Sequence, residues 1–222
     1  MFNWEKINVV LLDMDGTLLD LHFDNFFWLN HIPEKYAKAH NISLAKAQEY
    51  LHIETNKVSG EIEWYCLDYW TEKLNLPIVE LKKEIQHKIA LRPDTLPFLN
   101  ALKKANKKIV LVTNAHPDSL SLKIERTALD QHIDSLISTH TYGATKESQI
   151  LWKKLQADLK FNKDTTLFVD DSLTVLDSAK KFGIKYLLSV ANPDLKKPAL
   201  NETQLKGYPY IYDYRDIIDS IV

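Results

Sequence analysis

Two aspartates one residue apart, Asp13 and Asp15, directly follow an apolar run at 9–12, and Gly16 and Thr17 come next. A buried strand that ends on carboxylates brings charge to the sheet edge where open α/β folds bind ligands. Side chains alternate along a strand, so a turn at Gly16 would be needed to use both aspartates. Asp13 could then point into a site, while Asp15 offers a carbonyl to a cation and a carboxylate to proton transfer. The alternative is an ordinary surface turn after a buried strand.

Polar residues also end two later apolar runs. Thr113-Asn114 closes one run, and Asp170-Asp171-Ser172 closes another. Because the carboxyl ends of parallel strands meet at one edge of a sheet, we expect these side chains to lie near Asp13. The acidic pair with its serine is also typical of a helix N-cap, and the two interpretations are compatible.

The elements that must position these residues are short apolar strands alternating with helices. Continuous apolar runs predict strands at 7–12, 108–113, 166–169 and 185–190, and 134–138 is a further candidate strand. Amphipathic patterns predict helices between them at 96–105, 119–127, 148–159 and 173–182. The alternation predicts an α/β fold with a Rossmann-like parallel sheet. Residues 192–214 are rich in Pro and Tyr and predict irregular structure before a short terminal helix.

Between the first and second strands the pattern becomes helical and aromatic. Helices are predicted at 23–40, 44–56, 61–74 and 78–89, with prolines and a glycine between or within them. We therefore expect an inserted α-helical cap at 20–90 and a catalytic core made of 1–19 and 91–222. Most of the aromatic side chains of this cap are expected to pack against one another inside it, and one or two are expected to form a wall on which a flat base stacks.

Composition limits the classes of partner. The 222 residues are 45% hydrophobic and 26% charged with a formal net charge of −2. This balance predicts neither a nucleic-acid nor a membrane partner. Cys66 is the single cysteine, which excludes an intramolecular disulfide. The first apolar run is too short to cross a bilayer, so a cytoplasmic protein is expected, with its oligomeric state open.

The motifs together resemble the haloacid dehalogenase-like phosphohydrolases. The shared features, in order, are D-x-D-G-T at 13–17, Thr113, Lys146 and the acidic pair at 170–171, and the resemblance spans 11–183. It implies a Mg²⁺-dependent phosphomonoesterase that works through an aspartyl-phosphate. In that family pattern, Asp13 is the nucleophile and Asp15 protonates the leaving alcohol and then activates water.

The resemblance also implies which residues hold phosphate and metal. Thr113, the backbone at Asn114 and Ala115, and Lys146 would bind phosphate. The Asp13 carboxylate, the Asp15 carbonyl and Asp171 would hold Mg²⁺, with Asp170 acting through water. Glu147 follows Lys146 where the family usually has proline, and Lys153 and Lys154 are the alternative lysines.

A narrower resemblance concerns substrate. The segments 18–21, 24–25, 64–70, 113–117 and 138–141 are similar to the bacterial GMP/IMP nucleotidases, which implies a purine nucleoside monophosphate as the small-molecule substrate. Candidate substrate contacts are Asp20, Asp24, Asn25, Lys57, Trp64 and His116. A phosphatase of sugar phosphates or phosphoglycolate, a phosphomutase and a non-catalytic ligand-binding protein remain alternatives. A dehalogenase is less favoured, because dehalogenases lack the second aspartate and need no metal.

Overall fold

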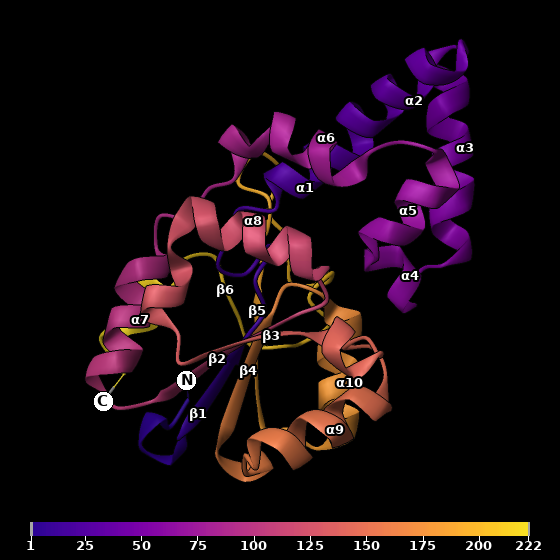
Figure 1. Cartoon of the computed structure of the whole chain (residues 1–222). Coiled ribbons are helices and arrows are strands. Elements are labelled where there is room, and N and C mark those ends of the chain that lie inside the picture. The colour runs from indigo at the N-terminus through magenta and orange to yellow at the C-terminus, as the bar shows by residue number, and fades with distance from the viewer. Residues whose placement is uncertain (1, 222) are drawn as a thin grey trace.

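The computed structural model describes residues 2–221, and Figure 1 shows a central sheet flanked by helices with a helical insert extending away from it. The strand order is β3-β2-β1-β4-β5-β6, and every neighbouring pair is parallel. The strands are β1 Val9–Leu12, β2 Lys108–Thr113, β3 Ser135–Ser138, β4 Thr166–Asp170, β5 Tyr186–Val190 and β6 Tyr210–Ile211. The predicted α/β fold is confirmed. The two residues of β6 lie in the segment expected to be irregular, and so short a strand carries no pattern that predicts it.

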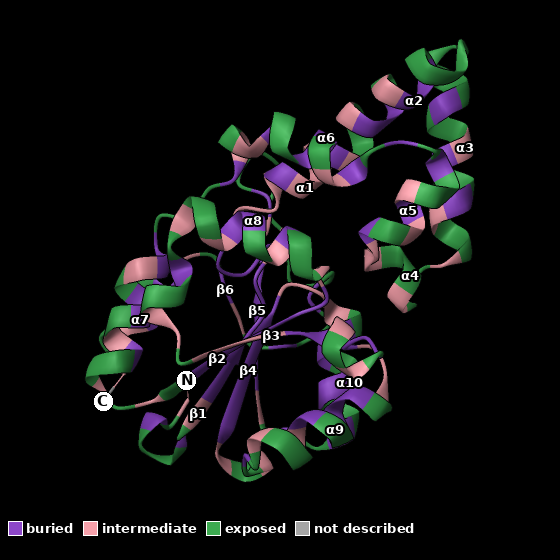
Figure 2. Cartoon of the chain, viewed as in Figure 1, coloured by how far each residue is buried: buried purple, intermediate pink, exposed green. Residues whose placement is uncertain are grey.

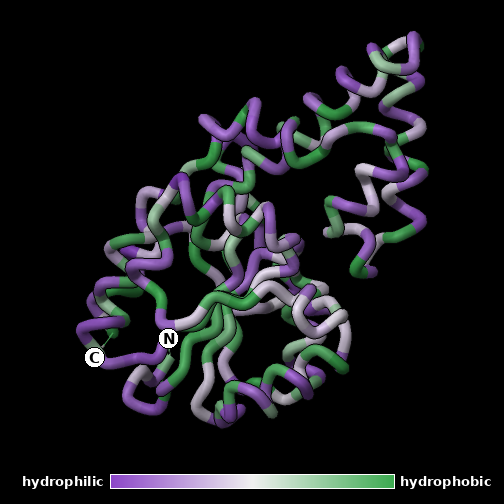
Figure 3. The backbone as a smooth tube through the Cα atoms, in the orientation of Figure 1, coloured by the Kyte–Doolittle hydropathy of each residue, from purple (hydrophilic) through white to green (hydrophobic). Residues whose placement is uncertain are grey.

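Helices cover both faces of the sheet because its strands are apolar on both sides. On one face, Val10 and Leu12 share a buried cluster with Phe98 of α7. On the other face, Leu11 shares a second cluster with Trp152 of α9 and residues of α10. Figures 2 and 3 show the strands as the buried, hydrophobic centre and the outer helices as mixed surfaces. The core helices are α7 Thr95–Lys104, α8 Pro117–Thr127, α9 Gln149–Leu159, α10 Leu173–Phe182 and α11 Arg215–Ile218.

The insert between β1 and β2 has its own hydrophobic core. Phe23, Phe27 and Trp70 are nearly fully buried in a cluster made almost entirely of insert residues. Its elements are α1 His22–Phe26, a π-helical turn Phe27–His31, α2 Ile32–His40, α3 Leu44–Lys57, α4 Ile62–Tyr65, α5 Leu67–Leu74 and α6 Ile78–Glu84. In Figure 1, α1 and α6 lie close to the core, α2 and α3 extend away from it, and α5 and α4 lie on the way back toward the core.

The structure differs from the expected helices in three places of the insert. The segment predicted as one helix at 61–74 is broken at Cys66, whose backbone is extended (φ −81°, ψ 113°). The Trp70 indole N–H donates to the Trp64 carbonyl at 2.9 Å, which satisfies a carbonyl that the broken helix leaves free. The helix predicted at 23–40 is interrupted by the π-helical turn Phe27–His31. This turn directly precedes Ile32-Pro33 at the start of α2, where proline lacks the N–H that would continue an α-helical register. The helix predicted at 78–89 ends at Glu84 and is followed by a 3₁₀ turn, Gln86–Lys88.

None of the helices in the described part of the chain combines the length and apolar character that a membrane crossing requires.

Candidate active site

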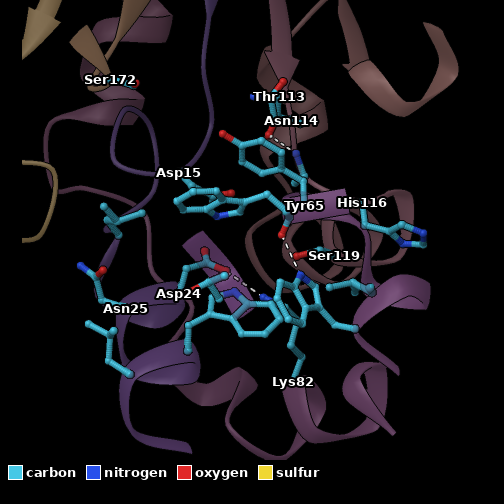
Figure 4. A pocket seen from close by; sticks show the side chains of 18 of the residues that line it. Asp15, Asp24, Asn25, Tyr65, Lys82, Thr113, Asn114, His116, Ser119 and Ser172 are labelled. Atoms are coloured by element: carbon cyan, nitrogen blue, oxygen red, sulfur yellow. Dashed lines mark hydrogen bonds and ion pairs between the residues drawn. The ribbon is translucent and has the colours of Figure 1, made fainter. Parts of the chain in front are cut away.

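The sheet changes direction of growth between β1 and β4. From β1 the chain builds β2 and β3 on one side, and then crosses to place β4 on the other side of β1. Open α/β sheets bind ligands at this switch point, beyond the carboxyl ends of the strands. A cavity of about 780 Å³ opens there between the core and the insert. Figure 4 shows Thr113 and Asn114 at one side of it and Asp24, Asn25 and Lys82 at the other.

A tight turn after β1 separates the two aspartates. Gly16 has φ +84°, and its N–H donates to the Leu19 carbonyl at 2.8 Å. A Cβ at this position would lie 2.6 Å from Asp171 Oδ2, so only glycine lets the two loops approach this closely. The expected turn at Gly16 is therefore present, and it also sets the space available to Asp171.

Lys146 lies at the centre of the carboxylates. Its Nζ donates to Asp13 Oδ1 and, at 2.7 Å, to Asp170 Oδ2. Burial alone would lower the pKa of Lys146, but the carboxylates of Asp13 and Asp170 raise it above its usual range. The lysine is therefore a permanent positive charge beside Asp13. The alternative lysines, Lys153 and Lys154, are exposed on α9.

The acidic residues form a compact cluster. One carboxylate oxygen each from Asp13, Asp170 and Asp171 lies within 4.8 Å of the others. Burial raises the pKa of Asp13 to about 6, although Lys146 lowers it. Burial, together with the charges of Asp170 and Asp13, also raises the pKa of Asp171 well above its usual range. Carboxylates crowded in this way gain from a cation between them.

The donors in this cluster fit a hard divalent cation. Asp170 already accepts from Lys146 and, at 2.8 Å, from the backbone N–H of Ser172. Within residues 2–221, no other residue donates a hydrogen bond to Asp171, and no backbone hydrogen bond of the turn uses the Asp15 carbonyl. Carboxylate and carbonyl oxygens are the ligands that Mg²⁺ prefers. The oxygens of Asp171 are therefore free to bind a cation, whereas both oxygens of Asp170 already accept hydrogen bonds.

The second aspartate of the motif has a separate partner. Lys123 Nζ of α8 lies 2.7 Å from Asp15 Oδ1. Burial raises the pKa of Asp15 to about 7, because it outweighs the lowering effect of Lys123. A carboxyl group that titrates near neutrality can both give and take a proton at that pH.

The loop after β2 is built around Asn114. Its side-chain oxygen accepts from the Lys146 N–H at 2.9 Å and from Thr139 Oγ1 at 3.0 Å. Thr113 Oγ1 accepts from the Ala115 N–H at 3.0 Å. The amide side chain of Asn114 therefore holds the Lys146 loop against β2, and Thr113 and Ala115 lie beside the acidic cluster in the same cavity.

The structure separates the six candidate substrate contacts into two groups. Asp24, Asn25, Trp64 and His116 line the cavity. Asp20 and Lys57 do not line it: Asp20 Oδ1 accepts from the Leu195 N–H at 3.1 Å, and the exposed Lys57 pairs with Glu54 at 2.6 Å. Three of the four lining residues are already engaged. Asn25 donates to Asp194 at 2.8 Å, both Asp24 oxygens accept from lysines, and His116 Nδ1 accepts from the Asp118 N–H at 3.3 Å.

Sequence reasoning missed several side chains of the site. Lys82 and Lys123 line the cavity from helices α6 and α8, where a lysine in an amphipathic pattern reads as surface. Glu147 accepts from Tyr65 of the insert at 2.8 Å and from Asn114 at 3.0 Å. The replacement of the usual proline by Glu147 was the one signal that could have identified this link.

Comparison with known proteins agrees with the architecture. The family model for haloacid dehalogenase-like hydrolases matches residues 7–183. The chain is 45% identical over 219 residues to the GMP/IMP nucleotidase YrfG of Escherichia coli, an alignment that covers 99% of this chain and 97% of that protein. A haloacid dehalogenase-like (HAD) phosphatase from Thermococcus onnurineus superposes with a TM-score of 0.78 at 22% identity, covering 97% and 98% of the two chains. A putative beta-phosphoglucomutase from Thermotoga maritima has a TM-score of 0.68 at 17% identity, over the same shares.

Proposed function

Because this chain belongs to the haloacid dehalogenase-like hydrolases, we propose that it is a Mg²⁺-dependent 5′-nucleotidase that acts on purine nucleoside monophosphates. The observation that carries the phosphatase chemistry is the ion pair of Lys146 with Asp13 and Asp170, at the switch point of the sheet and beside Asp171. The substrate class rests on the 45% identity to a GMP/IMP nucleotidase, which extends over core and insert alike.

In the first half of the reaction, an Asp13 oxygen attacks phosphorus and the bond from phosphorus to the ester oxygen breaks. The Asp15 carboxyl gives its proton to that ester oxygen, which leaves as the nucleoside alcohol. Lys146 neutralises Asp13, so that the anionic phosphate can approach it. Thr113 lies in the cavity beside Asp13, and its hydroxyl, which accepts from the Ala115 N–H, would donate its own proton to a phosphate oxygen.

In the second half, water attacks the phosphorus of the aspartyl-phosphate. The Asp15 carboxylate takes a proton from this water, and the bond between phosphorus and Asp13 breaks to release inorganic phosphate. The enzyme then has its starting protonation again. A Mg²⁺ ion bound by Asp13, Asp171 and the Asp15 carbonyl would supply positive charge for the transferring phosphoryl group.

The rest of the cavity fits a leaving group with a flat aromatic base. Its volume of about 780 Å³ lies within the range of small-molecule sites. Trp28, Trp64 and Tyr65 of the insert line it with partly exposed side chains. Aromatic side chains of this kind can stack on a purine, whereas a small acid such as phosphoglycolate would leave most of the cavity unfilled.

The test is phosphate release from a panel of monophosphates with and without Mg²⁺. The panel contains IMP, GMP, AMP, UMP, glucose 6-phosphate and phosphoglycolate, and the folded Asp13→Asn variant is the control. We expect IMP and GMP to be cleaved with the highest kcat/KM and only with the metal present. Preferential cleavage of the sugar phosphate or of phosphoglycolate would reject the substrate class. No release from any member would reject the enzyme and favour a binding protein.

A further inference from the structure

A chain of four alternating charges runs from Asp15 into the insert. Lys123 Nζ forms an ion pair with Asp15 Oδ1 at 2.7 Å and donates a hydrogen bond to Asp24 Oδ2 at 2.6 Å. Lys82 Nζ donates to the other Asp24 oxygen at 2.8 Å. Lys123 belongs to α8 of the core, whereas Asp24 and Lys82 belong to α1 and α6 of the insert. These four residues therefore connect the two parts of the molecule at the edge of the active site, and Figure 4 labels three of them, Asp15, Asp24 and Lys82.

The two lysines are held in a nearly dry environment. Their side chains are 2% and 3% exposed, and both ammonium groups lie over the ring of Phe23, at 5.5 Å for Lys123 and 4.9 Å for Lys82. A buried ammonium is costly unless it is paired. Removal of either carboxylate, Asp15 or Asp24, would take from a buried lysine one of its ion-pair partners. The positions of Asp15, Lys123 and Asp24 therefore depend on one another.

The contact with Lys123 uses one side of the Asp15 carboxylate. Lys123 binds Oδ1, and in residues 2–221 no hydrogen bond or ion pair involves Oδ2. Asp15 lines the cavity, and so does Lys123. One oxygen is therefore anchored from the core helix α8, and the other stays available to exchange a proton with a bound substrate.

We propose that Lys123 is a positioning residue that holds Asp15 for proton transfer, and that Asp24 and Lys82 hold Lys123 in place only while the insert is docked on the core. This inference rests on the proposed function, in which Asp15 protonates the departing ester oxygen. It adds that proton donation depends on the insert, through the contact of Lys123 with Asp15 Oδ1.

The test uses substrates that differ in their need for a proton. The alkoxide of IMP must be protonated to leave, whereas the nitrophenolate of p-nitrophenyl phosphate leaves without a proton. We measure kcat/KM, because it reports formation of the aspartyl-phosphate and not its hydrolysis. Loss of a positioned general acid costs on the order of 100-fold. For Lys123→Met we expect a loss of about that size on IMP and of less than about threefold on p-nitrophenyl phosphate.

Asp24→Asn is the second variant, because it keeps the shape of the carboxylate while weakening its hold on Lys123. It should show the same selective loss at roughly a tenth of the size. Lys163→Met is the matched control. This half-buried lysine donates to the Phe182 carbonyl at 2.8 Å, far from the cavity, and its loss should leave both substrates unaffected.

Three outcomes would overturn the inference. Equal losses on both substrates in Lys123→Met or Asp24→Asn, with a lower melting temperature, would show that the charges serve stability alone. Unchanged cleavage of IMP by the folded variants would show that Asp15 needs no anchor. If the unaltered enzyme cleaved neither phosphate ester, the proposed function itself would fail, and the inference with it. A selective loss on IMP supports the inference.

Discussion

Asp13 lies directly after β1, next to Lys146 and to the carboxylates of Asp170 and Asp171. Its backbone N–H donates to the Val169 carbonyl at 3.0 Å, which holds it at the edge of the sheet, and its side chain is paired with Lys146. An amide at this position keeps the shape but cannot attack phosphorus. We expect Asp13→Asn to reduce kcat by at least about 10⁴-fold while the circular dichroism spectrum stays unchanged. Retained turnover in this variant would remove the nucleophile assignment.

Asp171 is the carboxylate without a cation of its own. Its pKa is raised in the folded protein, so the protonated form is favoured by folding, and that contribution to stability is lost as the pH rises through the folded pKa. Without metal, Asp171 therefore contributes less to stability at pH 8 than at pH 5. We expect Asp171→Asn to raise the melting temperature of the metal-free protein at pH 8, and to do so less at pH 5.

The same substitution should weaken Mg²⁺ binding. Titration calorimetry on Asp171→Asn is expected to give an affinity at least about tenfold lower than that of the unaltered protein. Asp170→Asn is the comparison, because Asp170 is engaged by Lys146 and Ser172. A larger loss of affinity in Asp170→Asn would exchange the direct and water-mediated roles of the two residues.

At the scale of elements, the insert is tied to the core by the loop that carries Lys146. Tyr65 at the end of α4 donates to Glu147 at 2.8 Å, and Glu147 in turn accepts from Asn114 after β2. Tyr65→Phe removes one hydrogen bond to a charged group, worth about 1.5–3 kcal/mol at most. We expect kcat/KM for IMP to fall by about tenfold, mainly through a higher KM, because the docked insert becomes less favourable.

Tyr142→Phe is the control for this experiment. Its hydroxyl also donates to a carboxylate, Asp158, at 2.6 Å, but this pair is exposed and lies within the core domain, away from the cavity. Kinetic constants should not change in this variant. If the two substitutions have the same effect on kcat/KM, the link between Tyr65 and Glu147 has no role in docking the insert.

At the scale of the whole molecule, metal binding and folding should be linked. The cluster of Asp13, Asp170 and Asp171 draws on strands β1 and β4, which pair only in the folded chain. A ligand that binds the folded state alone at 100 times its Kd stabilises it by about 2.7 kcal/mol. For a protein of this size we expect Mg²⁺ to raise the melting temperature by roughly 5–10 °C and EDTA to reverse the shift. Asp171→Asn should lose most of the shift, and an equal shift in that variant would place the metal elsewhere.

The sequence determined the parallel α/β core and the helical insert, because both are written in local patterns. Apolar runs of strand length mark β1, β2, β4 and β5, and the polar residues of the site follow β1, β2 and β4 at one edge of the sheet. Motif order along the chain was enough to identify the family, and the expected turn at Gly16 is present. These properties depend on backbone preference and on the burial of whole segments, and both are determined by residues that are neighbours in the sequence.

Tertiary structure alone decided which charged side chains meet. Along the chain, Lys82 lies 58 positions from Asp24 and Lys123 lies 99 positions from it. Nothing in the helical pattern of α6 or α8 distinguishes a buried lysine from a solvated one. The packing of the insert on the core brings them together beside Asp15, while Asp20 and Lys57, equally polar in sequence, lie outside the cavity. Local pattern fixes which face of an element is apolar, but a charged residue takes its partner from whatever the neighbouring element presents, and that depends on the folded chain as a whole.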